Sequence, residues 1–199
     1  MKIVVIGATG TIGAPVADAL AARHEVVRVS RSGPLKADLE DAASLRRLFE
    51  QVRGVDAVVS CAGRTARRRP LAELGDEDFE VSIRGKLMGQ IDLARIAMHH
   101  VREGGSITLT GGVLSREPLA GAAHISMVNA ALEGFVLAAS IEMPRGIRIN
   151  LVSPPWISET LAALKMKEPR GIPAAACARA YVAAIEGTQQ GETLDARRY

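Results

Sequence analysis

The feature that most constrains this chain is the spacing of three glycines near its start, Gly7, Gly10 and Gly13. They follow a short β-branched run at 2–6, typical of a buried strand, and open a helix-forming stretch at 11–22. In such a unit, glycine is needed where the backbone takes a positive φ or must approach a pyrophosphate closely. The start of the helix also directs unsatisfied N–H groups and the positive end of its dipole at that anion. The turn therefore predicts a dinucleotide-phosphate site, the alternative being a tight strand–helix turn that binds nothing. Its residues are Gly7, Thr9, Gly10, Thr11, Ile12 and Gly13.

Strand-like and helix-like segments alternate along the rest of the chain. The patterns predict strands at 2–6, 25–29, 55–60, 106–109, 147–152 and 191–196, and helices at 11–22, 41–52, 76–101, 120–143 and 173–186. Hydrophobic residues make up 48% of the chain and aromatic residues only 3%, so the core must consist of small aliphatic side chains that suit strands buried on both faces. Because the 199 residues contain no repeat and no linker, we expect one domain over 1–199. Its class is α/β, a Rossmann-type doubly wound parallel sheet between two helix layers.

Charge, hydropathy and cysteine content argue against several other classes of protein. The net charge of +3 is too small to demand a nucleic-acid partner. The longest apolar stretches fall short of the ~18 residues that a membrane span needs, and the glycine turn interrupts the N-terminal one. Cys61 and Cys177 suggest neither a disulfide framework nor a metal site. We therefore expect a cytoplasmic protein without a metal, a membrane or a nucleic acid as partner.

Two groups of arginines bear on the cofactor and the substrate. The end of the second predicted strand, where NAD-binding folds place an acidic residue against the ribose, carries Ser30, Arg31 and Ser32 instead. A guanidinium and two hydroxyls suit the 2′-phosphate of NADP(H), so this cofactor is expected rather than NAD(H), unless Arg31 is an ordinary surface residue. The second group is Arg64 with Arg67 to Arg69. Such a run usually only solvates a loop, and the alternative is a collar that attracts an anionic substrate or the cofactor phosphates.

Four further stretches carry a family resemblance: Asp38-Leu39, Ser60 to Gly63, Asn129 to Phe135, and Gly146 to Ile157. They resemble the adenine-contacting pair, the Asn-Asn-Ala-Gly segment, the central helix and the nicotinamide loop of the short-chain dehydrogenase/reductase family. With the glycine turn, the resemblance covers nearly the whole chain. It implies further cofactor contacts from Asp38, Leu39, Cys61, Ala62, Gly63, Pro154, Ile157 and Thr160.

The chain departs from this family at the residues that carry its reaction. In the register set by the central helix, Ile125 takes the place of the family's tyrosine and Asn129 that of its lysine. Gly112 stands near the position of the helper serine, and Tyr181 and Tyr199 lie far away in sequence. The usual acid–base groups are therefore missing.

Lys86 and His124 are the candidates to compensate. Lys86 aligns with a structural asparagine of the family, so lysine and asparagine are exchanged between two facing helices. Lys86 would supply a cation near the nicotinamide ribose, oriented by the amide oxygen of Asn129, unless it is a solvent-exposed helix lysine. His124, next to the missing tyrosine, can donate a proton near neutral pH, although a lone histidine on an apolar helix is more often structural.

Two functional hypotheses remain open. The first is an NADP(H)-dependent oxidoreductase that moves hydride to or from a small carbonyl, imine or activated alkene. The second is a non-catalytic NADP(H)-binding redox sensor or scaffold, favoured by the missing tyrosine and lysine. The retained Ile157 and Thr160 argue against the second, because a protein that reads only adenosine would not require them.

Two features of shape and assembly also follow from the pattern. The segment 120–143 is apolar on all sides, so it should be buried or form, with 76–101, the interface of a homodimer or homotetramer. The segment 158–169 is expected to form a small lid over a shallow substrate pocket.

Overall fold

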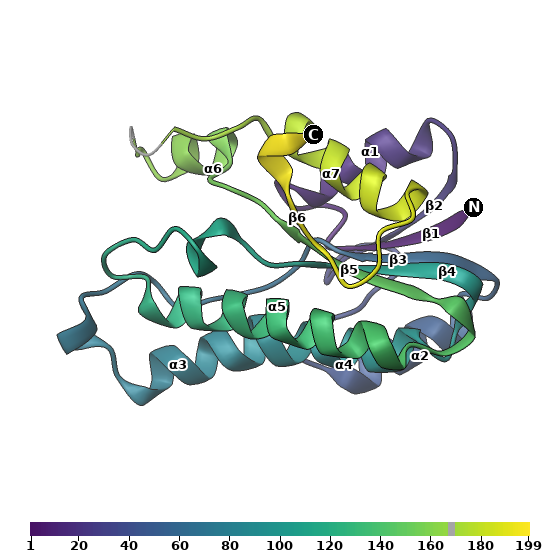
Figure 1. The fold of residues 1–199 in the computed structure, drawn as a ribbon, viewed down its shortest axis with the longest axis horizontal. Coiled ribbons are helices and arrows are strands. Elements are labelled where there is room, and N and C mark those ends of the chain that lie inside the picture. The colour runs from purple at the N-terminus through teal and green to yellow at the C-terminus, as the bar shows by residue number, and fades with distance from the viewer. Residues whose placement is uncertain (167–169) are drawn as a thin grey trace.

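The computed structural model describes residues 1–166 and 170–199, and its centre is a six-stranded sheet (Figure 1). The strands are β1 (Lys2–Ile6), β2 (Glu25–Val29), β3 (Val55–Ser60), β4 (Val101–Thr110), β5 (Arg148–Ser153) and β6 (Thr193–Asp195). Their order is β2-β1-β3-β4-β5-β6, and every pair is parallel. The order reverses between β1 and β3, which is where open α/β sheets bind their ligands.

Helices cover both faces of the sheet. One face carries α1 (Gly13–Ala21) and α7 (Ala174–Glu186), and the opposite face carries α2 (Ala42–Gln51), α4 (Gly89–Ala97) and α5 (Ala123–Glu142) (Figure 1). Each face has its own hydrophobic cluster: Leu20 and Tyr181 pack in one, Phe49 and Leu132 in the other. The three layers confirm the predicted doubly wound α/β fold.

The predicted helix 76–101 is wrong in its continuity and in its end. The structure divides it into α3 (Asp76–Ser82), a π-helical segment η2 (Ile83–Met88) and α4, which ends at Ala97. The strand β4 already begins at Val101, because Val101 pairs with Val55 before an irregularity restores the register at Ser106. A 3.6-residue pattern cannot distinguish a continuous α-helix from one with a wider turn inside it.

Short elements complete the chain. They are α6 (Ser158–Ala163) and the 3₁₀ turns η1 (Leu71–Glu73), η3 (Val113–Ser115), η4 (Pro144–Gly146) and η5 (Ala196–Arg198). After β2 the backbone makes one further parallel bridge, between Ser30 and Lys36. This bridge brings Asp38 and Leu39 beside the end of β1.

The helix α5 is long and apolar enough, by length and composition alone, to cross a membrane, with a mean hydropathy of 1.4 over its best window. The prediction that no stretch reaches that length is therefore wrong for this helix. Its inner side packs on the sheet through Val128, Leu132 and Val136, which are fully buried. Its outer side exposes Leu137 and Ile141, 64% and 85% accessible. A helix packed on a sheet along one face accounts for part of this composition, and the exposed apolar face remains to be explained.

Candidate active site

Two adjoining cavities lie at the carboxyl edge of the sheet. The β2-side cavity, about 340 Å³, opens over the ends of β1 and β2, and the β5-side cavity, about 310 Å³, over the ends of β4 and β5. They share one wall, Cys61, Ala62 and Gly63. Of the predicted cofactor residues, the β2-side cavity is also lined by Gly7, Thr9, Gly10, Ser30, Arg31, Asp38 and Leu39. The β5-side cavity is also lined by Ile12, Lys86, Pro154, Ile157 and Thr160, and by the predicted catalytic residue Asn129.

The glycine turn has the geometry that its sequence predicted. Gly7 has a φ of +80°, and a Cβ there would lie 3.0 Å from Ala62. A Cβ on Gly13 would lie 2.0 Å from the carbonyl oxygen of Gly7, so α1 can pack this closely on the turn only with glycine at that position. The first helical hydrogen bond runs from Ala14 N to Gly10 O. The amides of Thr11 to Gly13 therefore precede the helical ladder, as an anion site requires, although Thr11 and Gly13 do not line a cavity.

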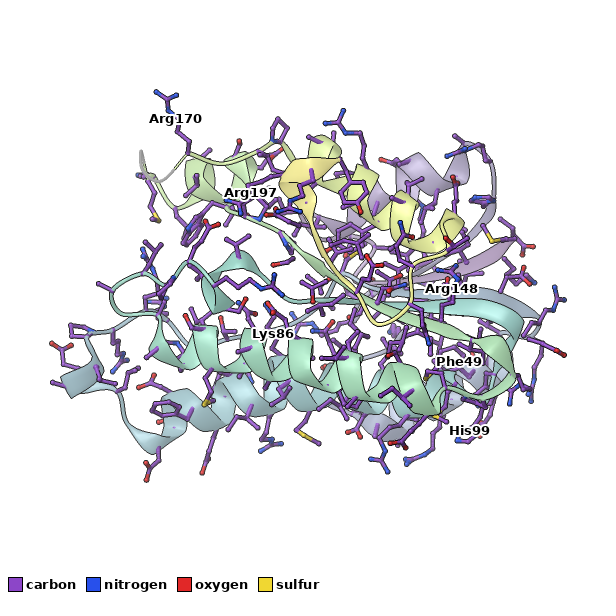
Figure 2. The ribbon with its side chains drawn as sticks, in the orientation of Figure 1. Phe49, Lys86, His99, Arg148, Arg170 and Arg197 are labelled. Carbon is purple, nitrogen blue, oxygen red and sulfur yellow. The ribbon has the colours of Figure 1, made fainter. Side chains whose placement is uncertain are left out.

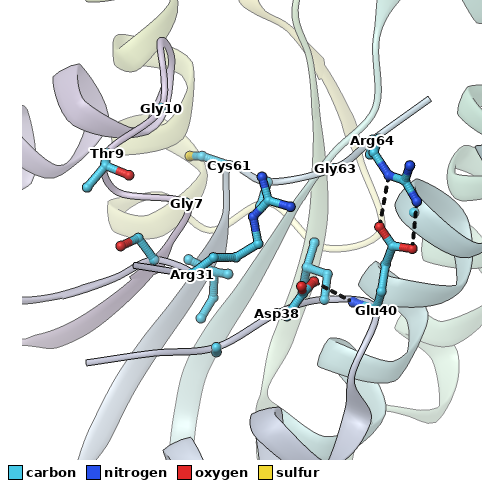
Figure 3. Close-up of a pocket in the computed structure, with 15 residues that line it drawn as sticks. Gly7, Thr9, Gly10, Arg31, Asp38, Glu40, Cys61, Gly63 and Arg64 are labelled. Atoms are coloured by element: carbon cyan, nitrogen blue, oxygen red, sulfur yellow. Dashed lines mark hydrogen bonds and ion pairs between the residues drawn. The ribbon is translucent and has the colours of Figure 1, made fainter. Parts of the chain in front are cut away.

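Arg31 is the polar side chain that Figure 3 shows reaching across the β2-side cavity. Ser30 and Ser32, predicted to bind the 2′-phosphate with Arg31, are not both placed to do so. The Ser30 hydroxyl accepts a hydrogen bond from Gly33 N (2.8 Å) and so caps the turn, and Ser32 lines neither cavity. Asp38 accepts from Glu40 N at 3.0 Å and lines the same cavity. A phosphate contact at this end therefore depends on Arg31.

An ion pair that the sequence did not reveal lies beside this cavity. Arg64 donates two hydrogen bonds, each 3.0 Å long, to the carboxylate of Glu40, and both residues line the cavity (Figure 3). This pair, with weaker contributions from Arg84 and Arg31, holds the pKa of Glu40 below its usual value. The two partners are 24 residues apart in sequence, and only the fold brings them together.

Lys86 projects from the π-helical segment η2 into the β5-side cavity. The residue as a whole is partly exposed, and its ammonium donates to the carbonyl oxygen of Gly111 at 2.8 Å (Lys86 is labelled in Figure 2). Its stem packs on the shared wall, where a Cβ on Gly63 would lie 3.2 Å from Lys86 Cγ. Burial lowers the pKa of Lys86 to about 8.

Asn129 faces the same cavity but does not orient Lys86 as predicted. Lys86 Nζ donates to Gly111 O instead, and Asn129 Oδ1 has no hydrogen-bond partner among the described residues. Asn129 Nδ2 lies against Gly112, because a Cβ there would come within 2.9 Å of it. The backbone of Gly111 and Gly112 thus intervenes between the two side chains. Asn129 is only 1% exposed, so its free oxygen is a buried acceptor at the cavity wall.

The structure places His124 away from both cavities. Its ring is fully buried, its Nε2 lies 3.2 Å from the carbonyl oxygen of Ala66, and Phe79 packs edge-on against it. The residue of this helix turn that lines the β5-side cavity is Ile125. His124 therefore anchors the loop that contains Ala66 and is not in position to reach a substrate in the cavity.

Tyr181 lies closer to the site than its sequence position suggested. Its hydroxyl is 2.8 Å from Thr110 Oγ1, and Thr110 lines the β5-side cavity. Tyr181 is nevertheless fully buried behind Thr110, and burial raises its pKa. Burial likewise raises the pKa of the Cys61 thiol, which supports packing over redox chemistry for that residue. Both groups therefore keep their protons at neutral pH and release them poorly.

The substrate side of the β5-side cavity is built by the segment after β5. Trp156, Ile157 and Thr160 line it, and α6 begins between them at Ser158. The lid predicted over 158–169 stays a prediction, and the last three of those residues lie outside the described part of the chain. Trp156 and Thr110 are cavity residues that the sequence reasoning did not select.

The cavities together fit a dinucleotide. At Gly7 and Gly13 a Cβ would fill the space that a pyrophosphate needs. Arg31 lines the β2-side cavity, where a 2′-phosphate is expected. In the β5-side cavity, the unpaired Asn129 Oδ1 can accept a hydrogen bond from a hydroxyl. Among the described residues, no group of His, Cys, Asp and Glu is arranged to hold a metal ion.

Comparison with known proteins places this geometry in a family. A family model described as enoyl-(acyl carrier protein) reductase matches residues 3–190. The hydroxynaphthalene reductase-like protein Arp2 of Metarhizium brunneum is 29% identical over 131 residues, which are 63% of this chain and 49% of that protein. Glucose and ribitol dehydrogenase homolog 2 of Arabidopsis thaliana is 25% identical over 138 residues, 66% of this chain and 47% of that protein. The chain thus spans about half the length of the curated relatives that it matches.

Solved structures are similar over almost the whole chain. The protein lin1944 from Listeria innocua is 38% identical, with a TM-score of 0.93 and 98% of each chain covered. A small-chain dehydrogenase in complex with NADPH is 27% identical, with a TM-score of 0.86, over 98% of this chain and 95% of that one. A short chain dehydrogenase from Burkholderia cenocepacia in complex with NADP is 26% identical, with a TM-score of 0.81, over 98% and 96%. The matched family model and the parallel sheet with a glycine turn at its switch point show that this chain belongs to the short-chain dehydrogenase/reductase family.

Proposed function

We propose that this protein is an NADP(H)-dependent oxidoreductase that transfers hydride to or from a small carbonyl, imine or activated alkene. The observation that carries the proposal is the shared wall Cys61 to Gly63. This wall joins a cavity with a phosphate turn to a cavity with a buried-stem lysine, so a ligand bound along it would reach from Arg31 to Lys86. Two structural relatives hold NADPH or NADP, which supports the choice of cofactor.

The residues that would hold the cofactor follow from the two cavities. The turn from Gly7 to Gly13 would bind the pyrophosphate, and Arg31 would bind the 2′-phosphate. Asp38 and Leu39 would face the adenine, and Asn129 Oδ1 would accept a hydrogen bond from a hydroxyl of the nicotinamide ribose. Ile157 and Thr160 would contact the carboxamide, as the family resemblance implies.

Lys86 is the proton donor in this proposal. The bound cofactor supplies a hydride for reduction and accepts one for oxidation. Lys86 Nζ gives one proton to the substrate oxygen as the carbonyl becomes an alcohol, and the neutral amine then takes a proton back from solvent. A lysine with a pKa of about 8 holds that proton at neutral pH and still releases it readily. The Gly111 carbonyl fixes the direction of the ammonium.

A non-catalytic NADP(H)-binding protein is the second candidate. The observation that favours it is Ile125, an apolar residue that lines the β5-side cavity where the family resemblance calls for a tyrosine. The two candidates differ in one measurement, the consumption of NADPH with a panel of aldehydes, ketones, imines and enones. Binding without turnover across the whole panel would establish the second candidate.

The cofactor assignment is tested by Arg31→Asp, with Arg179→Asp on the distant α7 as the control. The wild type should bind NADPH more tightly than NADH, because Arg31 pairs with the 2′-phosphate. Losing that charge-assisted contact should cost about 1.5–3 kcal/mol, and the affinity for NADH should change much less. Fluorescence titration of both reduced cofactors measures the two dissociation constants. Equal constants in the wild type would contradict the assignment, and Arg179→Asp should leave both unchanged.

A further inference from the structure

The loop in front of the β5-side cavity holds an arginine that forms no ion pair with any carboxylate in residues 1–166 and 170–199. Of the four arginines between β3 and α3, Arg64 pairs with Glu40, and Arg69 lies 3.9 Å from Asp78. Within the described part of the chain, Arg67 and Arg68 form no ion pair. Carboxylates of the described residues therefore pair with two of the four arginines, and the other two, Arg67 and Arg68, are exposed.

Arg68 lies over the cavity wall itself. Its guanidinium carbon is 5.3 Å from the ring centroid of Trp156, and Trp156 lines the β5-side cavity. On its other side, Arg68 Nη2 is 3.7 Å from Met166 Sδ, beyond the end of α6. A guanidinium that lies over an indole ring by a cation–π contact still has N–H groups that can donate to a carboxylate. Arg68 thus presents a fixed positive edge between the loop and the α6 segment.

The loop is held in place at three points. Ala66 N donates to Ser82 Oγ (3.1 Å), and the Ala66 carbonyl oxygen lies 3.2 Å from His124 Nε2. Arg69 N donates to the carbonyl oxygen of Gly121 at 3.0 Å. The backbone on both sides of Arg68 is therefore fixed before any ligand arrives, which reduces the entropic cost of using its side chain. The buried His124 therefore contributes to the site by holding the backbone of this loop at Ala66.

The rest of the cavity suits a small molecule with an apolar body. Val113, Leu114, Ile125 and Pro155 form apolar walls, and the polar side chains Lys86 and Asn129 line the same cavity. At about 310 Å³, the cavity is near the lower end of the range for small-molecule sites, and the nicotinamide end of the cofactor would occupy part of it, so the substrate must be small. A substrate with its reacting carbonyl at Lys86 and a second polar group at Trp156 would satisfy both ends.

We propose that the substrate of this site is a small carbonyl compound that carries a carboxylate, bound by Arg68 beside Trp156 while its carbonyl group faces Lys86. This inference rests on the proposed function for the carbonyl half and on Arg68 and Trp156 for the carboxylate half. One planar guanidinium matches one carboxylate in both shape and charge.

Trp156 is the single tryptophan of the chain, so its emission reports on this subsite without any turnover. Titration with butyrate should change the emission at low salt, whereas n-butanol, with the same carbon chain and no charge, should leave it unchanged. Arg68→Gln should weaken butyrate binding about 10- to 100-fold. Arg69→Gln, in the same loop but paired with Asp78, should bind butyrate like the wild type. A wild type that does not respond to butyrate, or an Arg68→Gln variant that responds equally, would overturn the proposal.

Turnover gives the second arm of the test. Succinic semialdehyde and butanal share a four-carbon aldehyde and differ in the carboxylate. The wild type should reduce succinic semialdehyde with the higher kcat/KM, and Arg68→Gln should lower that value while leaving butanal unaffected. Equal values for both aldehydes in both proteins would refute the carboxylate site and leave the oxidoreductase intact. NADPH and butyrate binding without reduction of any carbonyl would instead refute the oxidoreductase and leave the anion site.

Discussion

Lys86 lines the β5-side cavity, and no neighbouring carboxylate among the described residues offsets the effect of burial on its pKa. Among the described residues that line the β5-side cavity, the titratable side chains are Lys86 and Cys61. Burial raises the pKa of Cys61 and lowers that of Lys86 to about 8. A buried amine loses hydration of its charged form, and the Gly111 carbonyl returns only part of it. Of the two titratable side chains in this cavity, Lys86 is therefore the one whose protonation changes nearer neutral pH.

The rate of carbonyl reduction should follow the protonated fraction of Lys86. Because the donor must carry its proton, kcat/KM for reduction should be level below a pH of about 8 and should decrease above it. Oxidation of the alcohol needs the neutral amine, so its rate should increase through the same pH. Steady-state rates at saturating cofactor, measured in both directions, give the two profiles. The pH range should extend about two units on either side of the pKa of Lys86.

Lys86→Arg and Lys86→Met separate proton donation from charge. Arginine keeps the positive charge but does not release its proton, so Lys86→Arg should bind NADPH close to wild-type affinity and lose about 10²–10⁴-fold in turnover. Lys86→Met should lose turnover as well and bind the cofactor more weakly. A Lys86→Arg enzyme with an unchanged rate and an unchanged profile would exclude Lys86 as the donor.

At the scale of elements, the glycine turn lets α1 pack closer to the end of β1 than a residue with a side chain would allow. Gly13 is buried against the carbonyl of Gly7, so strand, turn and helix are assembled as one unit. The π-helical segment η2 is the second such element. It places Lys86 at the cavity, and the Gly85 carbonyl accepts a hydrogen bond from Arg64 N at 2.8 Å, which connects it to the loop after β3.

Gly13→Ala should damage both stability and cofactor binding. The added Cβ would lie 2.0 Å from the Gly7 carbonyl oxygen, so α1 must move away from the turn. We expect a loss of about 1–3 kcal/mol in the free energy of unfolding, measured by urea denaturation, together with weaker NADPH binding. Gly75→Ala is the control, since a Cβ there meets nothing within 4 Å, and it should cost less than about 1 kcal/mol as a change of N-cap. Equal stability of the two variants would mean that the turn relaxes freely.

At the scale of the whole molecule, the outer face of α5 is the surface that a monomer leaves unexplained. Between Ala123 and Glu142, the exposed first and last residues of the helix, its exposed residues are Met127, Ala130, Gly134, Leu137, Ala138 and Ile141, at helical spacing and with small side chains among them. Such a face suits close packing against the same helix of a second copy, and the predicted homodimer or homotetramer remains a prediction.

Charge placed on this face should separate the subunits. Light scattering at micromolar concentration should give a mass of at least twice 21.1 kDa for the wild type and 21.1 kDa for the double variant Leu137→Lys with Ile141→Lys. The reason is that two buried ammonium groups would lose their hydration without a partner. Leu71→Lys, at an equally exposed leucine on η1, should keep the wild-type mass. A wild-type monomer would contradict the predicted assembly.

The sequence by itself determined the features that depend on local backbone chemistry. Three glycines at fixed spacing after a β-branched run allow few conformations, so the turn, the strand and the start of the helix could be predicted with the site they form. The alternation of strands and helices then implies a parallel sheet, because parallel strands need crossover helices. The family resemblance then pointed to further cofactor residues such as Asp38 and Ile157, and these line the two cavities because the ends of parallel strands meet at one edge.

The tertiary structure alone decided the chemistry inside that edge. No sequence pattern marks the π-helical segment that directs Lys86 into a cavity. No pattern shows either whether His124 contacts the Ala66 backbone or a substrate, because that depends on which groups pack around its ring. The Glu40–Arg64 pair, the Thr110–Tyr181 contact and the Arg68–Trp156 cation–π contact join residues 24, 71 and 88 positions apart. Periodicity and spacing describe neighbours along the chain, whereas desolvation and hydrogen bonding are set by neighbours in space.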